Sequence, residues 1–472
     1  MLSMKKLTAA AMALICTLGI TACEDSAPAA SSSLPAGTTP TEITTTPKVT
    51  ATMSEENKEA IAEIDLEVEK LANPTVKFLS EWDLNPVEGT AVPVALEMFQ
   101  TKYGGNIEHI YVTWDGRYEK LATLVQSGDS PDMFSAGDLD VFPKGAINKM
   151  FEPMDEYIDF DSELWAPMKN VNDQFVYDGK HYVGAFSTNT ACVMIYNKRV
   201  IEENNLPDPA TLAKEGNWTW DTFWDMMMTF CDREQGKFAT DGWWFEGAFS
   251  QTCGLPYIGM EDGQVVHYLD AQPIERVQTF MYEMKKNDLP FPKSENNWTI
   301  VPANIAAGKT LFYPCGIWAL EEPDLSHFGT MDEIMFAPMP RCPDADAYYL
   351  PSVIDGFAIC KGAENPEGVA AYLNCAMACR ESEVAKEIDR EQHRTEYGWT
   401  DEMFEMLDFT RELTEQHPVI EFYNAVSDPL YEYVNNPMKE GYNSGASWTQ
   451  TKEMIRGMVQ GELDKANAKL DE

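Results

Sequence analysis

Strand-like and helix-like segments alternate along the chain after Pro74, and this alternation limits the fold more than any other feature. Strands that alternate with helices bury both faces of a sheet, so the pattern favours a mostly parallel, wound α/β architecture. The predicted elements are a strand over 76–81, a helix over 92–103, a strand over 107–113, a helix over 118–126 and a short strand after a turn at Pro131.

The length of the chain indicates how many lobes the folded part forms. The chain has 472 residues, and its folded part of about 400 residues exceeds what one hydrophobic core ordinarily holds. We therefore expect an α/β fold divided into two lobes.

The first residues predict export. Lys5 and Lys6 precede an apolar run over 7–20, and Ile20-Thr21-Ala22 leads to Cys23. This order is typical of a lipoprotein signal peptide over 1–22, with Cys23 as the acylated residue. An ordinary signal peptide with an incidental cysteine is the alternative.

Residues 23–53 are rich in Ala, Ser, Thr and Pro, as in a mobile tether. A charged helix is predicted over 54–73.

The acidic composition excludes several partners. The chain has 77 acidic and 35 basic residues and a formal charge of −42. Such an excess of negative charge makes nucleic acid an implausible partner and disfavours anionic lipid head groups. We expect membrane contact through the N-terminal lipid only. The 10 cysteines are too sparse for a disulfide scaffold and show no metal-ligand spacing.

The sequence gives little support to catalysis. It has no His-Glu-x-x-His or Gly-x-Ser-x-Gly pattern, and Ala303 replaces the first glycine that a phosphate loop over 303–310 would need. The acidic stretch Asp344-Ala345-Asp346 lacks the glycine turn and final glutamate of an EF-hand loop. We expect no metal, no cofactor and no catalytic residue. A pair of carboxylates acting as a glycosidase remains open, because acidic residues are so abundant.

Five ordered stretches resemble the family 1 extracellular solute-binding proteins, which include the maltose- and oligosaccharide-binding components of ABC importers. The most specific is GKHYVGAFSTNTACVMIYNKRVIEENNLPDP, followed by WTWDTFWDMM. The others are VKFLSEWD with VALEMFQTKYGGNIEHIYVTW, YEKLATLVQSGDSPDMFSAGD, ANIAAGKTLFYPCGIWAL and VIDGFAICKGAENPEGVAAYLNCAM. The resemblance runs from about Val76 to about Leu470.

The resemblance implies two α/β lobes that close on a ligand about crossing segments. The first crossing is expected near 191–196 and the return near 350–354. Lobe 1 would comprise 74–190 and 350–385, and lobe 2 would comprise 191–349 and 386–472. The implied function is capture of a sugar or oligosaccharide, by a monomer, for an ABC transporter permease.

Sugars have apolar C–H faces and a rim of hydroxyls, so a sugar site needs aromatic rings and polar side chains together. Polar positions beyond the carboxyl ends of strands are the first candidates. The resemblance adds Trp318 as a stacking ring and Asp138 as a hydroxyl contact, and Thr190 stands where some relatives have a carboxylate. The predicted ligand-binding residues are Trp82, Asp83, Asp138, Ser187, Asn189, Thr190, Trp243, Trp244, Trp318, Asp355, Gly356 and Trp448.

Two function classes remain beside the importer component. One is a cell-surface glycoside hydrolase, and the other is a structural or adhesive surface lipoprotein. A binding protein for a non-sugar solute such as a peptide would keep the same fold.

Overall fold

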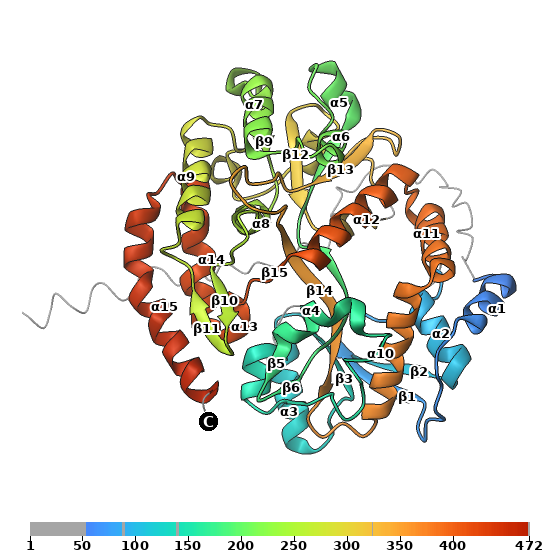
Figure 1. The fold of residues 1–472 in the computed structure, drawn as a ribbon. Helices are drawn as coiled ribbons and strands as arrows, with labels where there is room; N and C mark the ends of the chain where they lie inside the picture. The colour runs from blue at the N-terminus through green and yellow to red at the C-terminus, as the bar shows by residue number, and fades with distance from the viewer. Residues whose placement is uncertain (1–52, 87–89, 138–140, 323, 471–472) are drawn as a thin grey trace, which may run out of the picture. The chain divides into compact units, whose positions relative to one another are not determined.

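The computed structural model describes residues 53–86, 90–137, 141–322 and 324–470, all within the compact unit 49–472. The predicted signal peptide, Cys23, the tether and Asp138 lie outside the described residues. Two sheets organise the unit (Figure 1). The described helices are α1 (Glu55–Glu63), α2 (Val94–Tyr103), α3 (Arg117–Ser127), α4 (Lys169–Asn172), α5 (Lys198–Glu203), α6 (Pro209–Lys214), α7 (Trp220–Phe230), α8 (Phe245–Gln251), α9 (Gln272–Lys286), α10 (Pro366–Glu381), α11 (Glu383–Tyr397), α12 (Asp401–Gln416), α13 (Tyr423–Val426), α14 (Asp428–Asn443) and α15 (Trp448–Leu470).

The first sheet has the order β15-β14-β3-β1-β2, and β4 and β7 also pair with β14. β1 is parallel to β2 and β3, whereas β14 runs antiparallel to β3, β4 and β7. The strands are β1 (Thr75–Ser80), β2 (Asn106–Tyr111), β3 (Met133–Ser135), β4 (Phe151–Glu152), β7 (Gly184–Thr190), β14 (Leu350–Cys360) and β15 (Pro418–Val419). The predicted elements between 76 and 135 are therefore present.

A buried carboxylate explains the Pro-Asp pair that precedes β3. Asp132 accepts hydrogen bonds from the backbone N–H of Lys77 (2.8 Å) and of Asn365 (2.9 Å). Asn365 in turn caps α10 by accepting from the N–H of Gly368. One aspartate thus joins β1, the start of β3 and the start of α10, and it fixes the parallel strands to each other near their amino ends.

Helices α2 and α10 cover one face of the first sheet. Tyr372 of α10 packs edge-on against Phe99 of α2 (5.7 Å between ring centroids) and against Phe357 of β14 (5.8 Å). Helix α1 packs on α2, with Ile61 fully buried. Lys102 of α2 donates to the carbonyls of Ala62 and Ile64, where α1 ends. The helix predicted over 54–73 is therefore shorter than expected.

The second sheet has the order β13-β8-β12-β9 and lies under α5, α6 and α7 (Figure 1). Its strands are β8 (Val193–Asn197), β9 (Phe238–Thr240), β12 (Thr310–Cys315) and β13 (Ile334–Pro338). Two hairpins complete the strands: β5 (Val176–Tyr177) with β6 (Lys180–His181), and β10 (Ile258–Glu261) with β11 (Gln264–His267). Two sheets, each with its own helices, confirm the predicted two-lobe α/β fold.

The chain passes between the two sheets at adjacent points. β7 of the first sheet ends at Thr190 and β8 of the second begins at Val193, while β14 returns to the first sheet at Leu350. The two crossings are hydrogen-bonded to each other, because the N–H of Ala191 donates to the carbonyl of Pro351 (2.7 Å). Helices α11 and α12 form a third connection beside them (Figure 1). These crossings border the region where the candidate site lies.

Candidate ligand-binding site

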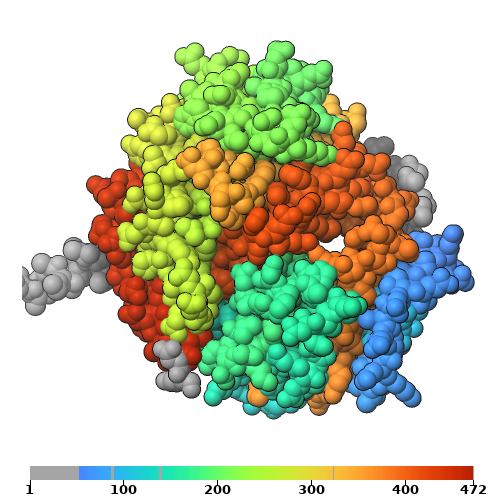
Figure 2. Space-filling model, in the orientation of Figure 1, coloured from blue at the N-terminus to red at the C-terminus, as the bar shows by residue number. Residues whose placement is uncertain are grey.

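A cavity of ≈ 1210 Å³ opens between the two sheets, beside the crossing strands. Its walls come from β7, β14, the loop after β1, the segment 316–321 after β12, and helices α10, α11 and α12. Figure 2 shows the surface hollowed between the orange helices α11 and α12 and the teal part of the first-sheet lobe. The cavity is therefore lined by both lobes and by the connections between them.

Aromatic rings face the cavity from both lobes. From the first sheet come Trp82, whose side chain is half exposed, and Phe186, which stacks on Phe357 (6.1 Å between centroids, 22° between planes). From the second comes Trp318, in the short 3-10 helix Ile317–Leu320, whose ring is also half exposed. Half-exposed rings contributed by both lobes offer flat apolar faces on which a ligand can stack.

The placement of Trp318 depends on a neighbouring glycine. A side chain on Gly316 would clash with the indole of Trp318, since a Cβ added there would lie 2.2 Å from its Nε1. Glycine thus lets the ring lie on the backbone of the turn that follows β12.

A chain of three polar side chains crosses the floor of the cavity. Arg411 Nε donates to Asn189 Oδ1 (2.8 Å), and Asn189 Nδ2 donates to Asp355 Oδ2 (2.5 Å). The three residues come from α12, β7 and β14, and all line the cavity. The arrangement offers hydrogen-bond acceptors on the carboxylate and donors on the guanidinium, side by side, as a hydroxyl-rich ligand requires.

A bulge in β7 lies opposite Asp355: the pairs Asp355–Ser187 and Gly356–Ala185 leave Phe186 as the extra residue. The register between β7 and β14 shifts between Asp355 and Gly356. Gly356 approaches the facing strand so closely that a Cβ would lie 2.8 Å from the carbonyl oxygen of Gly184. Bulges redirect side chains and recur at functional sites. Burial raises the pKa of Asp355, and the nearby charge of Arg411 opposes that rise.

Helix α11 holds the turn that carries Trp318. Trp399, just beyond α11, is buried and its indole donates to the carbonyl of Leu320 (2.9 Å). His393 of α11 faces Glu321 at 3.6 Å between Nε2 and Oε1. Burial lowers the pKa of His393, but the carboxylates of Glu321 and Asp389 outweigh it and raise the pKa to about 9. The imidazolium is therefore charged at neutral pH and pairs with Glu321.

The charges on the cavity walls disfavour anionic ligands. Eight carboxylates line the cavity against four lysines and arginines, and several of these pair with one another, such as Arg390 with Asp408 (2.5 Å) and Arg380 with Glu415 (2.6 Å). The acidic residues are Glu321, Asp355, Glu381, Glu383, Asp389, Asp408, Glu412 and Glu415, and the basic ones are Arg380, Lys386, Arg390 and Arg411. A neutral ligand meets no net repulsion there.

A family comparison matches residues 94–380 to the model described as "Bacterial extracellular solute-binding protein". The match spans more than half of the chain, including both crossings. This chain belongs to that family. The resemblance noted in the sequence is thereby confirmed, and the family is one of binding proteins that act outside the cytoplasm. No curated protein sequence matches this solute-binding protein.

Solved structures share the fold of this solute-binding protein at low sequence identity. The sugar-binding protein MalE from Xanthomonas citri has 16% identity and a TM-score of 0.59, over 83% of this chain and 98% of that one. The GacH receptor of Streptomyces glaucescens, solved unliganded and with acarbose, has 14% identity and a TM-score of 0.59, over 83% and 98%. UgpB from Mycobacterium tuberculosis, in complex with glycerophosphocholine, has 16% identity and a TM-score of 0.58, over 84% and 99%.

The cavity of this solute-binding protein brings together seven of the twelve predicted residues. They are Trp82, Ser187, Asn189, Thr190, Trp318, Asp355 and Gly356. Thr190 is buried and its hydroxyl donates to the carbonyl of Cys192 (3.0 Å), so it contributes to the crossing. Asp83 lies just outside the lining, where it accepts from Asn85 and faces His109 at 3.5 Å. Asp138 lies outside the described residues.

Trp243 and Trp244 are half exposed and lie beside the second sheet, outside the cavity lining. The buried ammonium of Lys293 donates to the carbonyl of Gly242 and lies 5.1 Å from the centre of the Trp243 ring. Burial raises the pKa of the neighbouring Asp241 to about 6. The sequence predicted both tryptophans as ligand contacts. In the structure both are half exposed, but neither lines the cavity.

Trp448, also predicted as a ligand contact, lies outside the cavity lining and is buried. It begins α15, only 8% of its surface is exposed, and its indole donates to the carbonyl of Leu269 (3.2 Å). Its ring packs against Tyr257 at 5.7 Å between centroids. An aromatic residue in a polar stretch of sequence is here a packing residue, because α15 presses that side of its first turn against the loop before α9.

Arg411, His393 and Phe186 line the cavity, and sequence reasoning missed all three. Phe186 lies inside the motif that suggested Ser187, but strand alternation would place it on the opposite face from Ser187 and Asn189. It is the extra residue of the bulge between β7 and β14, which the sequence does not reveal. Arg411 and His393 come from helices far along the chain, and no motif marks them. Their role depends on how α11 and α12 cross the cleft.

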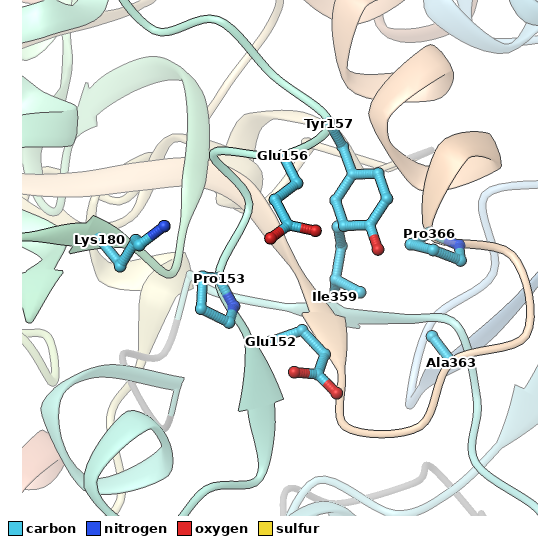
Figure 3. A pocket seen from close by; sticks show the side chains of 8 residues that line it. All are labelled: Glu152, Pro153, Glu156, Tyr157, Lys180, Ile359, Ala363 and Pro366. Atoms are coloured by element: carbon cyan, nitrogen blue, oxygen red, sulfur yellow. The ribbon is translucent and has the colours of Figure 1, made fainter.

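A smaller cavity of ≈ 160 Å³ lies within the first-sheet lobe and is shown in Figure 3. Glu152, Glu156 and Tyr157 surround it, and Lys361 pairs with Glu152 outside it (2.7 Å). Ligand pockets are usually about 300–1,000 Å³, so this cavity is too small for the same role.

Among the described residues, no cluster of three potential metal ligands occurs and no helix is long and apolar enough to cross a bilayer.

The cysteines of the described residues are single thiols. All eight in the described part of the chain are free, and seven are buried. Burial raises the pKa of the Cys375 thiol above its ordinary value, and it raises the pKa of Cys379 to about 12. These thiols therefore stay protonated at neutral pH and behave as small apolar side chains.

Proposed function

We propose that this protein captures a neutral sugar or oligosaccharide in the cavity between its lobes and delivers it to the permease of an ABC importer. The observation that carries the proposal is that Trp82 and Trp318, from different lobes, line one cavity together with the hydrogen-bonded chain Arg411–Asn189–Asp355. Rings stack on the C–H faces of a sugar, and the polar chain meets its hydroxyls.

Closure about the crossing strands is the proposed signal. We assign 74–190 and 350–385 to lobe 1 and 191–349 and 386–472 to lobe 2. A ligand that contacts both lobes binds the closed form more tightly and shifts the population toward it. The permease would then distinguish loaded from empty protein by the position of the lobes. A monomer suffices for this cycle.

Cavity size favours an oligosaccharide over a single sugar. Its volume of ≈ 1210 Å³ exceeds the range of about 300–1,000 Å³ typical for a small-molecule pocket. Proteins of the same fold include the sugar-binding protein MalE and the GacH receptor, which was solved with acarbose. The excess of carboxylates on the walls favours a neutral glycan.

We further propose that Cys23 carries the lipid that anchors the protein to the outer face of the cell membrane, with palmitate among its acyl chains. The support is the order of charge, apolar run and Cys23 in the first residues. Metabolic labelling with a fatty acid should mark the wild-type protein. A Cys23→Ser variant should lose the label and appear in the medium, and a label that survives the substitution would refute the anchor.

The sugar assignment is tested by a thermal-shift screen of the purified full-length protein against mono- and oligosaccharides, amino acids and short peptides. A ligand at 100 times its Kd stabilises the folded state by about 2.7 kcal/mol. We expect a selective rise in Tm with one class of oligosaccharide. A shift with a peptide or amino acid and none with any sugar would keep the fold and overturn the carbohydrate assignment.

A further inference from the structure

Exposed aromatic side chains lie at or just beyond the carboxyl ends of β1 and β2, and two of them, Tyr111 and Trp114, are outside the cavity lining. Trp82, Tyr111 and Trp114 have 43%, 69% and 51% of their surfaces exposed. The two strands are parallel with Ser80 opposite Tyr111, and the N–H of Val112 donates to the carbonyl of Ser80 (3.2 Å). Their carboxyl ends therefore share one edge, which is the edge where ligands of open α/β sheets bind.

Ring contacts through the buried Phe78 place Tyr111 near Trp82 and the cavity. Trp82 lines the cavity and also belongs to the exposed group. The successive distances between ring centroids are 6.1 Å for Phe186–Phe357, 6.3 Å for Phe357–Trp82, 5.2 Å for Trp82–Phe78, 6.2 Å for Phe78–His109 and 6.3 Å for His109–Tyr111. Tyr111 and Trp82 are thus exposed rings packed about one buried core ring, Phe78, at the same end of the two strands.

A buried cation fixes the ring of Trp114. The guanidinium carbon of Arg117 lies 4.1 Å from the centre of the indole, and Arg117 Nη1 donates to the backbone carbonyl of Trp114 (2.5 Å). Arg117 itself is buried. A ring already held on one side loses little freedom when a ligand covers its other side, so the contact forms at a small entropic cost.

We propose that Tyr111 and Trp114 form an outer binding platform for the distal rings of an oligosaccharide whose first rings occupy the cavity. The inference rests on the proposed function and specifies its ligand as a glycan long enough to leave the cavity. Uncharged aromatic faces suit the C–H faces of sugars, and the exposed carboxylates of Asp83 and Asp115 beside them suit hydroxyls. Trp82 lines the cavity and lies at the same strand ends as Tyr111, and this shared position argues for one ligand spanning both regions.

The test compares glycans of increasing length. Full-length protein is titrated calorimetrically with ladders of α-glucan, β-glucan, xylan and mannan oligomers, each from disaccharide to octasaccharide. For the ladder that binds, affinity should rise with length beyond the oligomer that fills the cavity. Tyr111→Ala should lower the affinity for long oligomers about 2- to 10-fold, which is the scale of one aromatic contact. Tyr111→Phe should keep it, and short oligomers should bind every variant equally.

Two controls separate the outcomes. Trp114→Ala removes the ring over a buried arginine, so its thermal stability is measured alongside, while Tyr111→Ala removes only an exposed edge side chain. Met454→Ala, at a position on α15 that is as exposed as Tyr111, controls for loss of surface apolar area. Equal affinity of wild type and Tyr111→Ala for every oligomer would overturn the platform and leave the proposed function intact. Absence of binding by all ladders to the wild type would overturn both.

Discussion

Replacing Trp318 with alanine tests the core of the proposed site. A tryptophan side chain presents about 150–250 Å², and 54% of Trp318 is exposed toward the cavity. A sugar that covers this exposed half removes about 80–130 Å² of apolar surface from water, which at about 25 cal/mol per Å² amounts to about 2–3 kcal/mol. The Kd should therefore rise about 30- to 150-fold.

Stability should change little in the same variant. The exposed half of the ring contributes nothing to the core, and the turn that carries it is held by the bond from Trp399 to Leu320. Isothermal titration gives the Kd, and thermal denaturation without ligand gives the Tm. Met228→Ala, half exposed on α7, is the matched control and should bind as the wild type does. Unchanged affinity of Trp318→Ala for the sugar that the wild type binds would refute the stacking role.

The polar and titratable groups lead to three more expectations. Arg411→Met should weaken sugar binding at least about 10-fold, because Asn189 and Asp355 lose the donor that orients them; titration calorimetry that finds no change would exclude the chain from recognition. Burial raises the pKa of Glu421 to about 8, against an unfolded value of about 4.3. The folded state then binds more protons between these values, so the free energy of unfolding falls as pH rises from about 4 to about 8, and Glu421→Gln should flatten that slope in urea titrations. The pKa of His393 is raised to about 9, so its stabilising contribution is complete below about pH 6.5 and is lost as pH rises through 9; His393→Gln should remove this alkaline loss, and an unaltered pH profile would show that the pair with Glu321 contributes nothing.

The sequence predicted the fold from local pattern and order. The strand and helix positions between β1 and β3 follow from periodicity and from the turn before Asp132, because each buries its apolar face locally. The end of α1 could not be predicted, because Lys102 of a different helix sets it through the carbonyls of Ala62 and Ile64. Tertiary contacts, not propensity, decide such ends.

The site was predictable where it lies in strands and their ends. Asn189, Trp318 and Asp355 lie in motifs whose geometry the strand order fixes. Arg411 was not predictable, because its place depends on the path of α12 across the cleft. Trp448 was predicted from its aromatic context alone, and aromatic residues serve packing and binding alike; the structure shows its ring buried and outside the cavity lining.

The most direct test of sugar capture is calorimetric titration of the full-length protein with the oligosaccharide class that raises its Tm, followed by recovery of the sugar. We predict saturable binding at one site, a negative heat-capacity change from burial of the aromatic walls, and the sugar recovered intact. A sugar recovered as cleaved products would identify a hydrolase, and the absence of saturable heat with every sugar would contradict capture of a glycan by this cavity.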